Sequence, residues 1–150
     1  MEISGGNERP YIIIGGRKFT DLTNLKTLYG YAAGGASKKC TFRTAVGDGY
    51  QVPVAKKFVV CAVEFTGSAA NSFCQLGYSD NNVGLDSATA FTNPVYPGGN
   101  ISAGALLAAT THTPYQYSFY FEVIASKYLG FTNPSTGDVY ARVYGYEEDV

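Results

Sequence analysis

Apolar and polar residues alternate with a period of two in the carboxy-terminal half of the chain, and this alternation constrains the fold more than any other feature of the sequence. From residue 115 to residue 123, every second position is aromatic or aliphatic, and these positions are Tyr115, Tyr117, Phe119, Phe121 and Val123. Because successive side chains of a β-strand point to opposite faces, the pattern predicts a strand with one face in a hydrophobic core.

The last predicted strand, Val139–Tyr146, alternates in the same way. Its second face carries three tyrosines and an arginine, namely Tyr140, Arg142, Tyr144 and Tyr146. A central run, Lys57–Phe65, is apolar on both faces, as is typical of a strand in the middle of a sandwich. The residues expected inside are Val59, Cys61, Val63, Phe119, Phe121, Val123 and Val143.

Eight to ten such strands are separated by turn signals, for example Gly47–Gly49, Pro97–Asn100 and Asn133–Asp138. The 18 glycines, 13 tyrosines and 9 phenylalanines suit strands joined by tight turns. We therefore predict an all-β fold, a two-sheet antiparallel sandwich of jelly-roll type. Short helices at Asp21–Tyr29 and Ser102–Ala109 are local alternatives that leave this class unchanged.

The first ten residues are polar and lack periodicity, so residues 1–10 are expected to form an extended N-terminal arm. Residues 11–150 are expected to form a single β-sandwich domain. The chain shows no leader-like amino terminus and no apolar run near the length that spans a bilayer, so neither export nor a membrane partner is expected.

Charge is distributed unevenly along the chain. Residues 1–57 carry nine Lys and Arg against four Asp and Glu, whereas residues 58–150 carry two against eight. The near-zero total argues against nucleic acid as a partner, since phosphate binding needs a net basic surface. The polarity instead predicts contacts between copies or with a shell, with Arg9, Arg17 and Lys18 as ionic anchors opposite an acidic end, Glu147–Asp149.

The residues that support catalysis or metal binding are few. Cys40, Cys61 and Cys74 have no metal-ligand spacing and are expected to be unpaired thiols. The single histidine, His112, precedes a Thr-Pro turn and lacks a nucleophile motif, so we predict that the chain is not an enzyme. Glu64 and Glu122 lie on predicted strands, and nothing positions them as a glycosidase pair.

A weak calcium candidate remains in the loop Asp80–Asp86, where Asp80, Asn82 and Asp86 are hard oxygen donors of the kind that calcium prefers. The distal glutamate of an EF-hand is missing, and the same residues are common in ordinary turns. We therefore expect no metal and no cofactor.

Tyrosine and arginine are enriched at protein interfaces, so the exposed tyrosines carry the main functional signal. The predicted interface residues are Arg9, Tyr11, Arg17, Lys18, Tyr140, Arg142, Tyr144 and Tyr146. An alternative is that the N-terminal arm or the segment 16–33 of the same chain covers this face.

Four stretches of the sequence resemble a known group of proteins in their succession of predicted strands and turns. These stretches are residues 48–60, 76–80, 120–123 and 140–147. They read DGYQVPVAKKFVV, LGYSD, YFEV and YARVYGYE, and they resemble jelly-roll decoration (cement) proteins of tailed bacteriophages and related head or tail fibre domains. The resemblance implies a non-enzymatic virion protein, assembled in the host cytoplasm. It also implies that the chain binds the major capsid protein on the outer shell, often as a homo-oligomer such as a trimer, and stabilises that shell.

Two other classes use the same architecture. A carbohydrate- or receptor-binding module of a phage fibre would stack exposed aromatic rings on sugars, although the chain lacks tryptophan, a common sugar platform. A cupin-like enzyme would need several histidines for its metal, and a chain with one histidine does not provide them.

Overall fold

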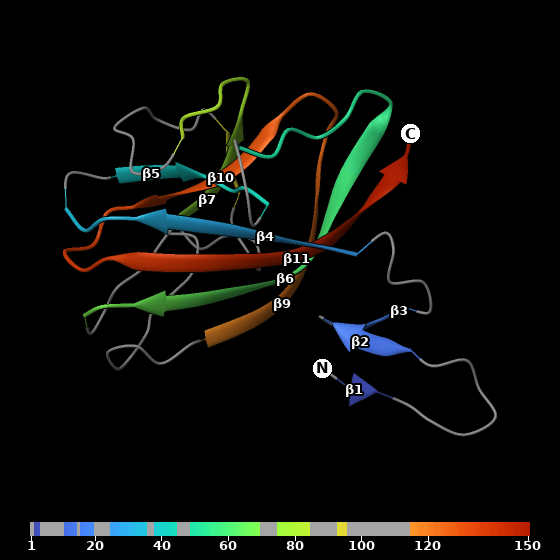
Figure 1. Cartoon of the computed structure of the whole chain (residues 1–150), viewed down its shortest axis with the longest axis horizontal. Coiled ribbons are helices and arrows are strands. Elements are labelled where there is room, and N and C mark those ends of the chain that lie inside the picture. Colours follow the sequence, from blue (N-terminus) through green and yellow to red (C-terminus); the bar gives the residue numbers. More distant parts are fainter. Residues whose placement is uncertain are drawn as a thin grey trace.

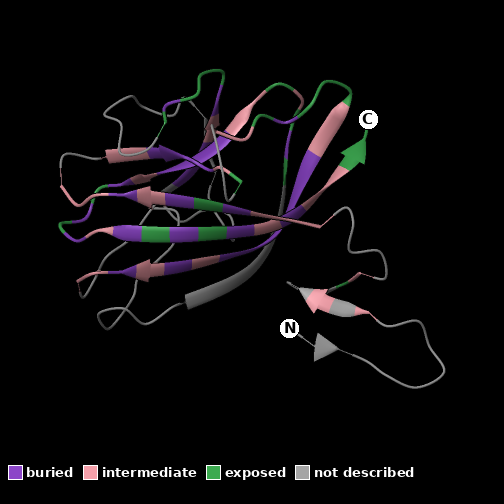
Figure 2. Ribbon diagram, in the orientation of Figure 1, coloured by how far each residue is buried: buried purple, intermediate pink, exposed green. Residues whose placement is uncertain are grey.

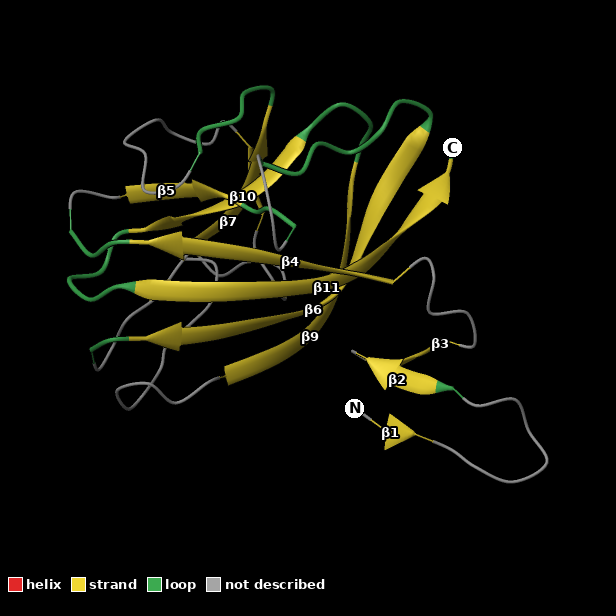
Figure 3. Ribbon diagram, viewed as in Figure 1, coloured by secondary structure: helices red, strands yellow, loops and turns green. Residues whose placement is uncertain are grey.

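The computed structural model describes residues 2–3, 11–14, 16–19, 25–35, 38–44, 49–69, 75–84, 93–95 and 115–150. All regular secondary structure in these residues is β-strand, which confirms the predicted all-β class (Figure 3). The strands are β1 (Glu2–Ile3), β2 (Ile12–Ile14), β3 (Arg17–Phe19), β4 (Leu25–Ala32), β5 (Lys38–Thr41), β6 (Lys56–Gly67), β7 (Gln75–Ser79), β8 (Asn93–Val95), β9 (Tyr115–Val123), β10 (Tyr128–Asn133) and β11 (Val139–Asp149).

Strands β4 to β11 form two four-stranded antiparallel sheets (Figure 1). The strand order is β4-β11-β6-β9 in one sheet and β5-β10-β7-β8 in the other. Eight antiparallel strands distributed over two sheets in this order have the topology of a jelly roll. The predicted sandwich is therefore confirmed, and its longest strands, β6 and β11, lie side by side in the first sheet.

The hydrophobic core lies between the two sheets. Phe131 of β10 is fully buried and its ring centroid lies 5.4 Å from that of Phe42. Gly30 of β4 makes room for this ring, because a Cβ at position 30 would come within 2.6 Å of Phe131 Cε1. Strand β11 contributes Val139, Ala141 and Val143, and Figure 2 shows these buried positions alternating with exposed ones along the strand.

Strand β6 contains an irregularity that the period-two pattern did not predict. Gly145 of β11 faces Val60, whereas the preceding residue faces Ala62, so Cys61 is an extra residue in a β-bulge. As a result Phe58, Val60, Val63 and Phe65 all join the central core cluster. Val59 and Cys61 are buried as predicted, but outside that cluster.

The other predicted core residues divide into two groups. Val63, Val123 and Val143 are buried in the core cluster, which confirms their prediction. The side chains of Phe119 and Phe121 lie outside the described residues. Cys40 and Cys61 are buried thiols that form no disulfide within the described residues, as expected, and Cys74 lies outside the described residues.

Several strand boundaries differ from the sequence interpretation. The alternative helix at Asp21–Tyr29 is wrong from residue 25 onward, because those residues begin β4. The predicted strand at Tyr50–Val54 forms one isolated bridge, with Gln51 opposite Tyr128. Residues 102–109, the second possible helix, lie outside the described residues.

The first three strands form a separate small sheet in the order β1-β2-β3 (Figure 1). Each strand has two or three residues. The ring of Phe19 on β3 packs edge-on against Tyr146 of β11, with 5.6 Å between the centroids. Among the described strands, the sandwich thus begins with β4 at Leu25, and Glu2–Ile3 of the predicted arm pairs with β2 in a separate sheet.

Candidate binding site

The outer face of the β4-β11-β6 sheet carries the polar and aromatic residues that alternate with the core. Strand register places Tyr31 of β4, Tyr140 of β11 and Thr66 of β6 in one row across the sheet. The next row contains Tyr29, Arg142 and Glu64. Because each residue faces its neighbours directly across the strands, these six side chains form one continuous surface.

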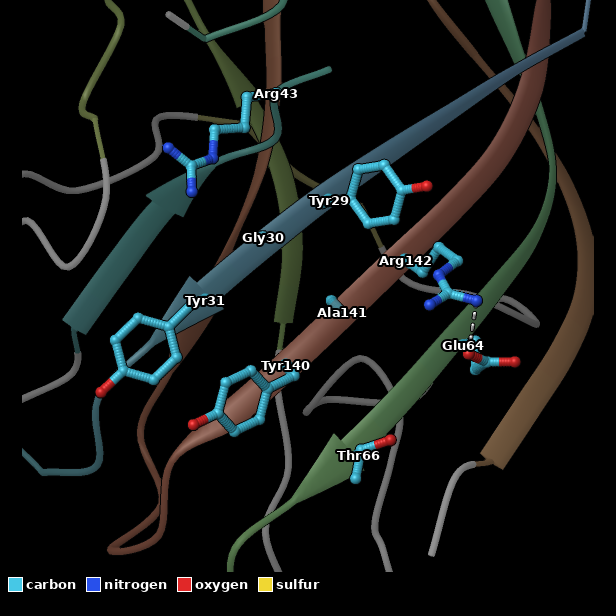
Figure 4. A pocket seen from close by; sticks show the side chains of 9 residues that line it. All are labelled: Tyr29, Gly30, Tyr31, Arg43, Glu64, Thr66, Tyr140, Ala141 and Arg142. Atoms are coloured by element: carbon cyan, nitrogen blue, oxygen red, sulfur yellow. Dashed lines mark ion pairs between the residues drawn. The ribbon is translucent and has the colours of Figure 1, made fainter. Parts of the chain in front are cut away.

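Specific contacts join the members of this surface (Figure 4). The ring centroids of Tyr31 and Tyr140 lie 5.0 Å apart, with the planes tilted by 39°. The guanidinium of Arg142 lies 5.4 Å from the ring centroid of Tyr29, a cation–π distance, and 3.6 Å from the carboxylate of Glu64. Arg142 therefore connects all three strands.

A pocket of about 390 Å³ opens in this surface. The six side chains line it together with Gly30 and Ala141, and Arg43 lies at its rim (Figure 4). Tyr29 and Tyr140 remain 37% and 48% exposed, so their rings are available to a ligand. Among the described residues, Arg43 makes no ion pair, which leaves a positive charge beside the pocket.

Arg142 keeps its charge in this environment. Its guanidinium donates a hydrogen bond to the hydroxyl of Tyr144 at 3.2 Å, and this bond, together with nearby Glu64, raises the pKa of Arg142 above its ordinary value. The pocket thus presents a permanent cation beside a carboxylate, with phenol rings on one side.

The structure divides the predicted interface residues into two groups. Tyr140, Arg142 and Tyr144 lie on the outer face near the pocket, whereas Tyr146 packs against Phe19 of the N-terminal sheet. This contact agrees in part with the alternative that the chain covers its own face.

The remaining predicted interface residues belong to the first nineteen residues. Lys18 lies 4.1 Å from the ring centroid of Tyr11. Arg17 pairs with Ile14 through its backbone, and its side chain lies outside the described residues, as does Arg9.

Sequence reasoning did not select Tyr29, Tyr31, Glu64, Thr66 and Arg43 for this surface. A signal for the first two was present, because Leu28, Gly30 and Ala32 alternate with the tyrosines on one strand. Which residues become neighbours across two strands depends on the register of strand pairing, and the sequence of one strand does not reveal that register.

Basic residues of the first half of the chain form ion pairs with acidic residues of the second half. Lys26 lies 3.5 Å from Glu147, and Lys56 lies 2.8 Å from Asp149. Lys57 lies 2.8 Å from Glu122 and 3.1 Å from Glu148. The acidic end of β11 therefore pairs with lysines of the basic half on β4 and β6, and contacts with another copy are not needed to explain it.

The carboxylates Glu64 and Glu122 each have a basic partner of their own, Arg142 and Lys57 respectively. The geometry thus does not assemble them as an acid and a nucleophile around a shared substrate bond. His112 lies outside the described residues.

The calcium candidate shows the contacts of an ordinary turn. Asp80 forms an ion pair with Lys127, and the side-chain oxygen of Asn82 accepts a hydrogen bond from the backbone N–H of Gly84 at 3.0 Å. Asp86 lies outside the described residues. Within the described ranges, no three His, Cys, Asp or Glu residues cluster as a metal site would require.

We therefore expect chelation to leave stability unchanged. The melting temperature should be the same within error in millimolar CaCl₂ and in EDTA, because Asp80 is already neutralised by Lys127. A melting temperature several degrees higher in calcium would show that the loop binds the ion.

In the part of the chain that the structure describes, no helix has the length and apolarity needed to cross a bilayer. Comparison of the chain with protein families, with characterised proteins and with solved structures finds no match.

Proposed function

We propose that this chain is a non-enzymatic virion protein that binds the outer surface of a phage capsid and stabilises it. The resemblance to decoration proteins and the jelly-roll topology support this proposal together, since jelly rolls are common in capsid components. The major capsid protein is the proposed partner, and a homo-oligomer such as a trimer is the proposed arrangement on the virion.

The observation that carries the proposal is the small N-terminal sheet outside the sandwich. Its strands are two or three residues long, and strands this short bury too little surface to be stable alone. The ring of Phe19 on this small sheet contacts the ring of Tyr146 on the sandwich. A sheet of this kind gains stability when its edge pairs with a strand of another chain, a recurrent mode of protein recognition.

The side chains of this small sheet are also of the kinds that bind a partner protein. Lys18 is exposed and lies over the ring of Tyr11, which combines a cation with an aromatic ring. We propose that the N-terminal sheet attaches the chain to the shell and that the sandwich remains outside it. Salt should then slow attachment, because exposed charges at an interface act mainly on the association rate.

Deletion of residues 1–19 tests this proposal. The truncated chain should keep the sandwich, with a melting temperature within a few degrees of the full chain, because every residue of the core cluster lies between Leu28 and Val143. Its binding to heads of the virus whose genome encodes it should fall at least tenfold in a co-sedimentation assay.

A charge-reversal pair provides a sharper variant. Arg17→Glu with Lys18→Glu should weaken head binding several-fold, whereas Lys38→Glu with Lys39→Glu on β5 changes net charge equally and should have little effect. If the chain without residues 1–19 binds heads as tightly as the full chain, the proposed attachment through this sheet is wrong.

A further inference from the structure

The pocket on the β4-β11-β6 sheet is distinct from the proposed attachment sheet. Tyr140 precedes Tyr146, the residue in contact with Phe19, by six positions on β11. At about 3.4 Å per residue, Tyr140 lies roughly 20 Å from Tyr146 along the strand, and Arg142, the pocket residue on β11 nearest to Tyr146, lies roughly 14 Å from it. Both surfaces could therefore be occupied at the same time.

The pocket has the size of a small-ligand site. Its volume of about 390 Å³ lies near the lower end of the range of roughly 300–1,000 Å³ for ligand pockets. Neighbouring strands are about 4.8 Å apart and alternate residues about 7 Å apart, so the two rows of three side chains cover roughly 10 by 7 Å. One or two sugar rings fit such an area, whereas a folded protein partner needs a much larger one.

The residues that line the pocket can make both kinds of contact that bind a sugar, namely packing of aromatic rings and hydrogen bonds to hydroxyls. Tyr140 and Tyr31 present tilted ring faces that can pack against the C–H groups of a sugar. Arg142 and Glu64 provide a donor and an acceptor side by side, suited to neighbouring hydroxyls. Their separation of 3.6 Å is longer than a good hydrogen bond, so both groups retain capacity for a ligand.

The positive charge of Arg43 at the rim of the pocket favours sugars that carry a carboxylate over neutral sugars. Glu64 is matched by Arg142, whereas Arg43 has no carboxylate partner among the described residues. Arg43 is a half-buried residue beside the pocket, and a guanidinium can bind a carboxylate through two parallel hydrogen bonds.

From these observations we infer that the pocket binds a saccharide that carries a carboxylate group, such as a uronic acid. Tyr140 and Tyr31 pack against the ring, Arg142 and Glu64 bind hydroxyls, and Arg43 binds the carboxylate. All these residues except Arg43 are on long, paired strands, so the site is held in place before the ligand arrives.

Glycan-array binding followed by calorimetry tests this inference. The full chain should retain uronic acid-containing oligosaccharides above neutral ones of equal length. Tyr140→Ala should weaken binding of the best oligosaccharide at least tenfold, and Glu64→Gln several-fold. Arg43→Gln should remove the preference for acidic over neutral sugars. Tyr128→Ala, in β10 of the other sheet, is the matched tyrosine control and should leave sugar affinity unchanged.

The same variants separate this inference from the proposed attachment to a shell. Tyr140→Ala should bind virus heads like the full chain, because the N-terminal sheet is intact in it. Retention of no glycan, retention of neutral glycans alone, or equal glycan affinity in Tyr140→Ala would each overturn the inference. Loss of head binding in Tyr140→Ala would assign the pocket to a protein interface instead.

Discussion

Replacement of Phe131 by alanine is expected to lower the free energy of unfolding by about 3–5 kcal/mol, as is typical for a buried phenylalanine. The Phe131 side chain is fully buried between the sheets and packs against Phe42 at 5.4 Å. Backbone at Gly30 already lies close to this ring, so the surrounding strands have little freedom to fill the cavity. Urea denaturation followed by fluorescence measures the change.

Two variants calibrate this expectation. Phe131→Leu keeps much of the buried volume and should cost less than half as much as the alanine variant. Thr132→Ala changes the next residue of β10, which faces the opposite side and is partly exposed, and should shift stability only slightly. A loss below about 1 kcal/mol in Phe131→Ala would mean that the ring is not a principal core contact.

Asn133→Ala is expected to destabilise the chain by about 2–5 kcal/mol, because it leaves several buried backbone groups without a partner. The side-chain nitrogen of Asn133 lies 3.0 Å from the carbonyl oxygen of Ala32, 3.1 Å from that of Ala33 and 2.8 Å from that of Gly137. Its side-chain oxygen accepts a hydrogen bond from the backbone N–H of Ser135 at 3.0 Å. One amide thus joins the end of β4 to the turn between β10 and β11.

Asn133→Asp should destabilise the chain further. It replaces the donor by a carboxylate oxygen that faces the same carbonyls, and it buries a negative charge. Ser135→Ala removes a single hydroxyl from the network and should have a smaller effect, so that thermal melting ranks the three variants. Equal melting of Asn133→Ala and the unmodified chain would show that water satisfies these carbonyls.

The fold class could be predicted because the strongest signals are local. Alternation along Val139–Tyr146 correctly separated the buried residues of β11 from the exposed ones. The same reasoning treated Asn133–Asp138 as a plain loop, because a sequence shows that asparagine favours turns but not which distant carbonyls its amide reaches. The bulge at Cys61 was missed for a related reason, since an extra residue is defined only against the partner strand.

The candidate pocket was only partly predictable. Tyr140 and Arg142 were selected from one strand, and their contacts with Tyr31, Tyr29 and Glu64 depend on pairing with β4 and β6. The residues between β11 and these partners number more than seventy, and no local pattern sets a register over that separation. The unequal charge of the halves was visible, but its use in ion pairs within the chain required the same pairing.

The central position of β11 has a consequence for how the protein is made. This strand lies between β4 and β6, which do not pair with each other, so the edge of each strand that faces β11 stays unpaired until residues 139–149 have left the ribosome. During synthesis, β4 and β6 therefore each have an unpaired edge and an exposed apolar face, and this state is prone to aggregation. Folding is therefore expected to follow translation of β11 and to be slow, because contacts distant in sequence dominate. A ribosome-stalled chain lacking residues 139–150 should be protease-sensitive, and extension by that single strand should convert it to a resistant one.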